Sequence, residues 1–153
     1  MKKITKIALI LTLSSLVIFA FTGCAGITAT ATQETVQAAA DAQGFTTFYA
    51  TENGNLNLSL TVNISATATL VFTQFDTVAD ARTRFTQHEQ TINAYSTHSR
   101  SIRSSVGANE FWRVNAGGSF YALYRTDAAI MFAVGQVGDR EAIQDFINSI
   151  VRV

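Results

Sequence analysis

The most constraining feature of this sequence is a long run in which apolar and polar residues alternate. From Leu56 to Phe72 every even position is apolar, and the odd positions up to Thr69 are Asn, Ser or Thr. Alternation with a period of two is typical of a β-strand with one buried and one solvated face. A single strand over this run would be about 56 Å long at ~3.3 Å per residue, too long for a small domain. We therefore predict a hairpin that turns near Ser65 and Ala66.

The segments on either side carry further helix and strand signals. We predict helices over residues 34–43 (capped by Thr32 and ended by Gly44), after Thr77, and after a cap at Asp139. We predict strands over residues 45–50, 109–115, 120–125 and 128–134, with turns at 52–55, 117–118 and 126–127. Residues 97–107 are polar and rich in serine, and we interpret them as a connection that contains Arg100 and Arg103.

Two hairpins are each followed by an amphipathic helix, over residues 58–92 and 120–150. The helix stripes are Val78, Ala81, Phe85, His88 and Ile92 in the first unit, and Ala142, Ile143, Phe146, Ile147 and Ile150 in the second. A hairpin with one apolar face and a helix with one apolar stripe can cover each other. The sequence therefore predicts an α+β fold: an antiparallel β-sheet of five to six strands with two to three helices on one face, as two ββα units would form.

Charge and composition narrow the class of protein. Hydrophobic residues make up 48% of the chain and charged residues 14%, which is typical of a folded domain rather than of a disordered chain. The only lysines lie in the first six residues, and the rest of the chain carries a net charge of −3. Because binding to phosphates needs clustered cations, a weakly acidic domain without lysine argues against a nucleic-acid partner.

The N-terminus has the organisation of a secretory signal peptide. Lysines within the first six residues precede an uncharged run over residues 7–21, and small residues follow it. The one cysteine of the chain, Cys24, comes directly after Gly23 at the end of this run. A single cysteine excludes an internal disulfide framework and a cysteine-rich zinc site. The position of Cys24 at the end of the uncharged run indicates instead that the cysteine is a site of modification.

Residues 21–24 (Phe-Thr-Gly-Cys) resemble the lipobox of bacterial lipoproteins. This resemblance implies that Cys24 is diacylated through its sulfur and becomes the new N-terminus. Gly23 matches the small residue before the cysteine, while Phe21 departs from the usual leucine. Two other interpretations remain open at this point: a retained transmembrane anchor over residues 7–27, and ordinary cleavage after residues 29–31, which would release a soluble protein.

We accordingly divide the chain into a lipoprotein-type signal peptide (1–23), a flexible tether (24–32) and a single α+β domain (33–153). The order of a lipobox-like cysteine, a helix, a hairpin, the strand end 72–76 and the C-terminal segment 124–147 resembles small uncharacterised cell-envelope lipoproteins of Gram-positive-type bacteria. The resemblance implies a location at the outer face of the cell membrane and a fold. It implies no functional residue.

Motifs for catalysis or metal binding are missing from the sequence. There is no Gly-x-Ser-x-Gly elbow, phosphate-binding loop, His-x-x-x-His pair or cysteine pair. We interpret His88 and His98 as structural. The carboxylates that could serve a hydrolase are Glu110, Asp127, Asp139 and Glu141, of which the last three have ordinary roles in turns and at a helix start. We predict no catalytic residue, no cofactor and no metal.

One cluster of residues has a composition that is typical of binding surfaces. Aromatic and arginine side chains gather around the turn at 117–118: Phe111, Trp112, Arg113, Tyr121, Tyr124 and Arg125. Only one face of an alternating hairpin can enter the core, so we predict that some of these rings lie outside it. Tryptophan, tyrosine and arginine are enriched in binding hot spots. The cluster is therefore the predicted partner surface.

The sequence thus predicts a membrane-anchored, extracytoplasmic lipoprotein that acts as a non-enzymatic binding or accessory module. Its partners would be the membrane, through a lipid on Cys24, and a protein or another envelope component, with no nucleic acid. Two alternatives remain: a binder of small ligands or peptides that uses the aromatic and arginine hairpin, and a hydrolase of the cell envelope with a pair of carboxylates.

Overall fold

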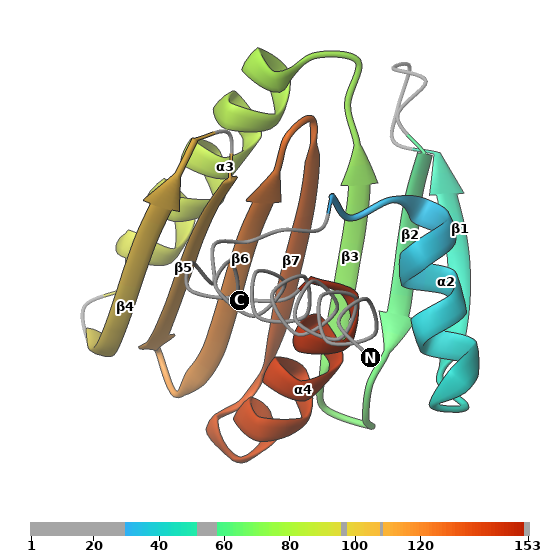
Figure 1. Ribbon diagram of the computed structural model, residues 1–153. Helices are drawn as coiled ribbons and strands as arrows, with labels where there is room; N and C mark the ends of the chain where they lie inside the picture. The colour runs from blue at the N-terminus through green and yellow to red at the C-terminus, as the bar shows by residue number, and fades with distance from the viewer. Residues whose placement is uncertain (1–29, 52–57, 96–97, 108, 152–153) are drawn as a thin grey trace, which may run out of the picture.

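The computed structural model describes residues 30–51, 58–95, 98–107 and 109–151 (Figure 1). The described elements, in chain order, are α2 (Gln33–Ala42), β1 (Thr46–Thr51), β2 (Leu58–Asn63), β3 (Thr69–Gln74), α3 (Val78–Asn93), β4 (His98–Val106), β5 (Asn109–Ala116), β6 (Ser119–Thr126), β7 (Ala129–Gln136), the 3₁₀ helix η1 (Val137–Asp139) and α4 (Arg140–Ile150).

The seven described strands form one antiparallel sheet with the order β1-β2-β3-β7-β6-β5-β4. Two meanders, β1 to β3 and β4 to β7, meet where β3 pairs with β7, and α3 lies between them in the chain (Figure 1). The long alternating run turns where we expected, because the N–H groups of Ile64 and Ser65 both donate to the carbonyl of Ala68. The predicted α+β class is confirmed, and the sheet has more strands than the five to six expected.

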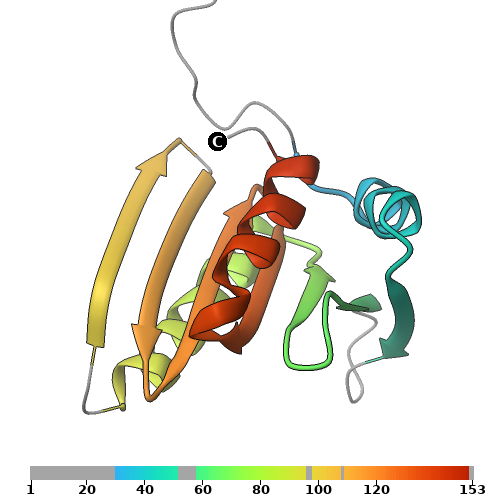
Figure 2. The ribbon, with the colours of Figure 1, turned by 90° about the horizontal axis from the view of Figure 1, so that it is seen from below.

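The helices cover both faces of the sheet, whereas we expected them on one face (Figures 1 and 2). On one face, Val36 of α2 and Phe146 of α4 belong to a core with alternate residues of β2, β3, β6 and β7. On the other face, Phe85 and Ile92 of α3 pack with Trp112 and its neighbours. Strands β6 and β7 are therefore buried on both sides over much of their length, and their sequences are apolar almost without interruption.

The segment expected to be a polar connection forms the edge strand β4, which corrects that expectation. It pairs with β5, with a register irregularity between Ser99 and Ile102 and a left-handed backbone at Arg100 (φ 51°). Residues 98–105 are all exposed, so no apolar alternation marks the strand in the sequence. An irregular, arginine-bearing edge resists pairing with another chain.

Threonine caps begin α2 and α3, as the sequence predicted. The Thr32 hydroxyl accepts a hydrogen bond from the N–H of Thr35 at 3.2 Å, and the Thr77 hydroxyl accepts one from the N–H of Asp80 at 3.1 Å. Each bond satisfies one of the free N–H groups in a first helical turn. The residues around Thr32 and Thr77 were therefore enough to predict both caps.

The expected cap of α4 is different, because the Asp139 carboxylate bonds no N–H group of that helix. It accepts hydrogen bonds from the hydroxyls of Thr67 (2.7 Å) and Ser65 (3.0 Å) and from the N–H of Gln136 (2.9 Å). These bonds, that from Thr67 above all, lower the pKa of Asp139. Asp139 therefore ties the β2–β3 turn to the end of β7.

Ala31, which the sequence analysis assigned to the flexible tether, is part of the folded core. It is 1% exposed, and its N–H donates to Oγ1 of Thr126 on β6 at 3.2 Å. Within the described ranges, no helix has the length and apolar character needed to cross a membrane. The predicted signal peptide and Cys24 lie outside the described residues.

Candidate functional site

The six residues predicted to form one partner surface are divided between the two faces of the sheet. Successive side chains of a strand point to opposite faces, and the register of β5 with β6 fixes which pairs share a face. Trp112, Tyr121 and Arg125 point toward α3, whereas Phe111, Arg113 and Tyr124 point toward the face that carries α4. The expectation of a single surface is therefore wrong.

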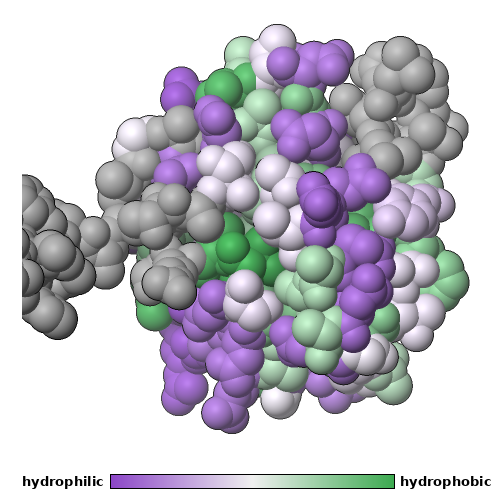
Figure 3. Space-filling view, turned by 45° about the vertical axis from the view of Figure 1, so that its right-hand side comes forward, coloured by the Kyte–Doolittle hydropathy of each residue, from purple (hydrophilic) through white to green (hydrophobic). Residues whose placement is uncertain are grey.

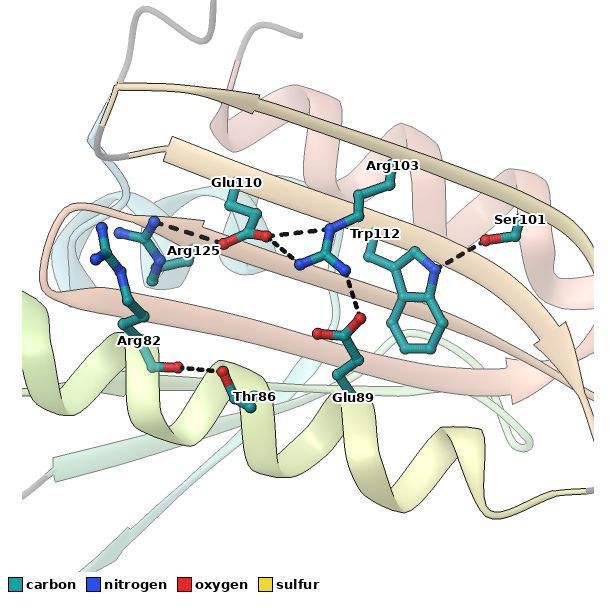
Figure 4. Close-up of polar contacts among 8 residues, drawn as sticks. All are labelled: Arg82, Thr86, Glu89, Ser101, Arg103, Glu110, Trp112 and Arg125. Atoms are coloured by element: carbon teal, nitrogen blue, oxygen red, sulfur yellow. Dashed lines mark hydrogen bonds and ion pairs between the residues drawn. The ribbon is translucent and has the colours of Figure 1, made fainter.

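The three residues on the α3 side are buried. Exposed fractions are 5% for Trp112, 9% for Tyr121 and 2% for Arg125. The indole N–H of Trp112 donates to Oγ of Ser101 on β4 at 2.9 Å, so the polar atom of the ring is also satisfied (Figure 4). Because α3 covers this part of the sheet, we withdraw these three residues from the predicted surface.

A network of charged residues lies next to Trp112, between α3 and the strands β4 to β6 (Figure 4). Arg103 donates from Nε and Nη2 to Oε1 of Glu110, at 3.2 and 2.5 Å, and also pairs with Glu89 of α3. On the other side, Nη2 of Arg125 is 3.6 Å from Oε2 of Glu110. The hydrogen bond to Glu110, with the charges of both glutamates, raises the pKa of Arg103 although burial opposes it.

This network gives Glu110 a role that the sequence did not reveal. Its carboxylate joins β4, β5 and β6, and Arg103 extends the connection to α3. A carboxylate used as a general acid or base must reach a substrate. Both oxygens of Glu110 instead lie within ion-pair distance of arginines. We interpret the network as a structural clamp between the helix and the edge of the sheet.

The two histidines also have structural contacts. The ring of His88 stacks on Phe132 with centroids 4.4 Å apart, beside a cleft of about 140 Å³ that Arg84 also lines. A ring nitrogen of His98 is 3.1 Å from the carbonyl oxygen of Ile92 at the end of α3. In the part of the chain that the structure describes, no three His, Cys, Asp or Glu side chains are grouped to hold a metal ion.

A hollow of about 560 Å³ lies between α2 and β1 and is open to solvent. Its polar side chains bond to one another: the Gln37 amide donates to Asp41 (2.7 Å) and Thr47 (3.2 Å) and accepts from the Tyr49 hydroxyl (2.9 Å). Figure 3 turns the side of α2 and β1 toward the viewer. Hydrophilic residues are prominent on that face, and strongly hydrophobic colour occupies only a small part of it. Gln37, Asp41 and Tyr49 thus already bond to one another across the hollow.

The other three residues of the predicted surface lie together on the α4 side, where Asn115 joins them, and we call these four residues the β5 shelf. It consists of Phe111, Arg113 and Asn115 on β5 and Tyr124 on β6. The rings of Phe111 and Tyr124 stack with centroids 5.5 Å apart, and the Arg113 guanidinium carbon is 4.9 and 5.4 Å from their centroids. Arginine over two aromatic faces is a cation–π arrangement.

No described helix covers the outer part of the shelf. Figure 2 shows α4 over β6 and β7, with β5 and β4 beside it on the same face. Ile102 of β4, which pairs with Arg113, is 48% exposed, and the three β5 residues of the shelf are half-buried. The shelf is thus bordered by a helix on one side and an edge strand on the other.

Three buried polar atoms of the shelf have no hydrogen-bond partner among the described residues: Nε of Arg113, Oδ1 of Asn115 and the hydroxyl oxygen of Tyr124. Tyr124 is 1% exposed, and this burial raises its pKa, while the charge of the nearby Arg113 opposes the shift. Buried polar atoms nearly always have partners, because an unpaired one costs free energy. Each of these three atoms is enclosed by the domain itself, so the bonds that they lack do not identify a ligand site on the surface.

Two residues of this region escaped the sequence analysis. Asn115 continues the alternation of Phe111 and Arg113 by two residues, a signal that the sequence did contain. Arg140 begins α4, far along the chain, and its guanidinium carbon is 5.4 Å from the ring centroid of Phe120 on β6. Only the docking of α4 on the sheet brings that cation to this face.

Comparison with known proteins adds no relative to these observations. No protein-family model, no curated protein and no solved structure matches the chain.

Proposed function

We propose that this chain is a lipid-anchored, extracytoplasmic module that binds a partner or ligand on the β5 shelf and catalyses no reaction. The observation that carries the proposal is the shelf itself, where half-buried aromatic and arginine side chains stack on a part of the sheet that no described helix covers. Binding sites commonly combine apolar rings with a few convergent polar groups. A role in binding accounts for both features.

The anchor part of the proposal is supported by Cys24, which follows Gly23 at the end of the uncharged run. Two acyl chains on one residue give stable membrane attachment, whereas one gives only marginal attachment. Residues 25–30 separate Cys24 from the folded Ala31, and such a segment spans at most about 20 Å when extended. The domain would therefore stay near the bilayer, with the end that contains Thr126 toward the lipid.

Mass spectrometry of the mature protein tests the anchor. We expect a diacylglyceryl group on an N-terminal Cys24, and its loss in the Cys24→Ser variant. A membrane-bound form that retains Met1, or a soluble form that begins near Gln33, would overturn the lipid anchor. Either result would leave the binding site on the domain to be judged by its own experiment.

Site-specific photo-crosslinking in the source cell tests binding. A photoreactive amino acid replaces Ser104, which pairs with Phe111 and is exposed at the rim of the shelf. The matched control replaces Thr83, which is exposed on α3 at the other face of the sheet. We expect a discrete adduct from position 104 that is lost in an Arg113→Gln background, and none from position 83. Equal labelling from both positions, or adducts that ignore Arg113, would contradict the proposal.

A further inference from the structure

We infer that the outer edge of β1 binds an extended basic segment of a partner protein, which adds to the sheet as a further strand beside α2. β1 and the β5 shelf lie toward opposite edges of the sheet, so this inference goes beyond the proposed function and is tested separately from it. It follows from the exposed backbone edge of β1, from the hollow beside α2 and from the charge at this end of the domain.

The outer edge of β1 is exposed and suited to strand pairing. β1 is the last strand of the sheet, and no described strand pairs with its outer side. Thr46, Phe48, Tyr49 and Ala50 are all exposed, and the strand contains no charge, proline or glycine that would discourage pairing. The other edge strand, β4, has a register irregularity and two arginines. Irregularity and charge commonly protect sheet edges, and an edge without them can pair with another chain.

The outward backbone groups of β1 belong to Thr47 and Tyr49. Successive residues of an antiparallel strand direct their N–H and C=O groups alternately to one side and to the other. Ile64, directly after β2, donates its N–H to the carbonyl of Ala68 across the turn to β3, so the odd-numbered residues of β2 bond toward β1. Their partners in β1 are the even-numbered residues, such as Phe48. Thr47 and Tyr49 therefore each present a donor and an acceptor to a strand added outside β1.

The hollow beside α2 lies on the side where an added strand would run. Gln43, at the end of α2, donates to Ser149 of α4, whereas Gln37 on the other flank of α2 bonds to Thr47 and Tyr49 of β1. This second flank and Tyr49 line the hollow, away from α4 (Figure 1). Alternate side chains of an added strand would extend into it. In recognition by strand addition, main-chain bonds supply affinity and such spaces for side chains supply specificity.

The charge at this end of the domain selects a basic segment. Between Lys6 and Arg82 the sequence has five acidic residues and no Lys, Arg or His, so α2 and β1 to β3 contain no cation. Glu34 and Asp41 of α2 line the hollow. A Lys or Arg side chain in the hollow would meet carboxylates and no like charge. A second copy of the chain would instead bring two acidic ends together, and like charges across an interface oppose binding.

Fluorescence anisotropy with the full-length chain in detergent micelles tests the inference. The probe is a carboxyfluorescein-labelled heptapeptide of alternating Thr and Lys, and matched probes have Gln or Glu in place of Lys. A fourth probe has the Lys sequence with a methyl group on every backbone nitrogen, so it keeps the charge but cannot pair as a strand. We expect saturable binding of the Lys probe, about tenfold weaker binding of the Gln probe, as two exposed ion pairs would give, and no measurable binding of the other two.

Charge variants test the contribution of the hollow. The double variant Glu34→Gln and Asp41→Asn should weaken binding of the Lys probe about tenfold and leave the affinity for the Gln probe unchanged. The matched control, Glu141→Gln with Asp145→Asn, removes the same charge from exposed positions on α4 and should change neither affinity. Far-UV circular dichroism of each variant establishes that it is folded.

Hydrogen–deuterium exchange measured by NMR tests whether the probe pairs with β1. We expect the N–H groups of Thr47 and Tyr49 to exchange more slowly when the Lys probe is bound. The N–H of Phe48 points toward β2 and should change little. Electrostatic attachment to α2 alone would leave all three exchange rates unchanged.

The remaining outcomes would each overturn the inference. Failure of the Lys probe to bind, equal affinity for the Lys, Gln and Glu probes, or no loss of affinity in the Glu34 and Asp41 variant would exclude a basic segment. Binding of the methylated probe, or unchanged exchange at Thr47 and Tyr49, would exclude strand addition. Slower exchange at these two residues as the concentration of the chain alone rises would assign the edge to a second copy. None of these results would affect the β5 shelf.

Discussion

Truncating the chain at residue 33 instead of residue 30 tests where the folded domain begins. The longer form keeps Ala31, which is buried in the core and donates its N–H to Thr126, and Thr32, which caps α2. Loss of the buried methyl group is worth about 0.8 kcal/mol, the hydrogen bond about 1 kcal/mol and the cap about 1 kcal/mol. We expect the form 33–153 to be less stable than 30–153 by about 3 kcal/mol, a large fraction of a typical domain stability.

Urea denaturation followed by far-UV circular dichroism measures this difference. At ordinary m values of about 1–3 kcal/mol/M, a loss of about 3 kcal/mol moves the midpoint by roughly 1–3 M. Thr126→Val in the longer form replaces the accepting hydroxyl with a methyl group and should cost about 1 kcal/mol. Equal midpoints of the two forms would refute the reasoning and return the boundary to residue 33.

Three further predictions concern residues inside the domain. Trp112→Ala should cost about 3–5 kcal/mol in a urea titration, whereas Phe48→Ala, at a ring that is 54% exposed, should stay within about 0.5 kcal/mol; similar costs would contradict the assignment of Trp112 to the core. Glu110→Ala should cost about 2–3 kcal/mol because it removes the carboxylate that Arg103 and buried Arg125 share, and Glu89→Ala less than about 1 kcal/mol because its partner Arg103 is half exposed. The reverse order would exclude Glu110 as the centre of the network. The lowered pKa of Asp139 should make the native chain more stable than Asp139→Asn at pH 7. This difference in stability should shrink as the pH falls below the ordinary pKa of 3.8 and through the lowered pKa of Asp139 in the folded chain. Parallel curves of stability against pH for the two chains would rule out that coupling.

Local sequence patterns were sufficient to predict an element and its buried residues wherever one face of the element meets water and the other meets the core. The alternation between Leu56 and Phe72 predicted β2, β3 and the turn between them. The predicted apolar stripe of α4 is buried, apart from Ala142, which is exposed. Periodicity carries this information because the backbone geometry of a strand or helix fixes which residues share a face.

The same principle explains why β4 was missed. Its side chains are exposed on both faces, so its sequence has no period, and only the backbone bonds to β5 make it a strand. Those bonds depend on a partner strand and not on the residues of β4 itself. The placement of the helices on both faces of the sheet was missed for a related reason. The sequence of a strand that is buried on both sides does not indicate which helix covers which face.

By itself, the sequence determined the α+β class, most of the elements and the gathering of aromatic and arginine residues on one hairpin. Only the tertiary structure decided that Trp112 belongs to the core while Phe111 and Arg113 form the shelf. Adjacent residues of a strand always point to opposite faces, but which face is covered depends on where α3 and α4 dock. Docking is set by contacts between residues far apart in the chain, such as that of Arg140 with Phe120, and no local pattern records them.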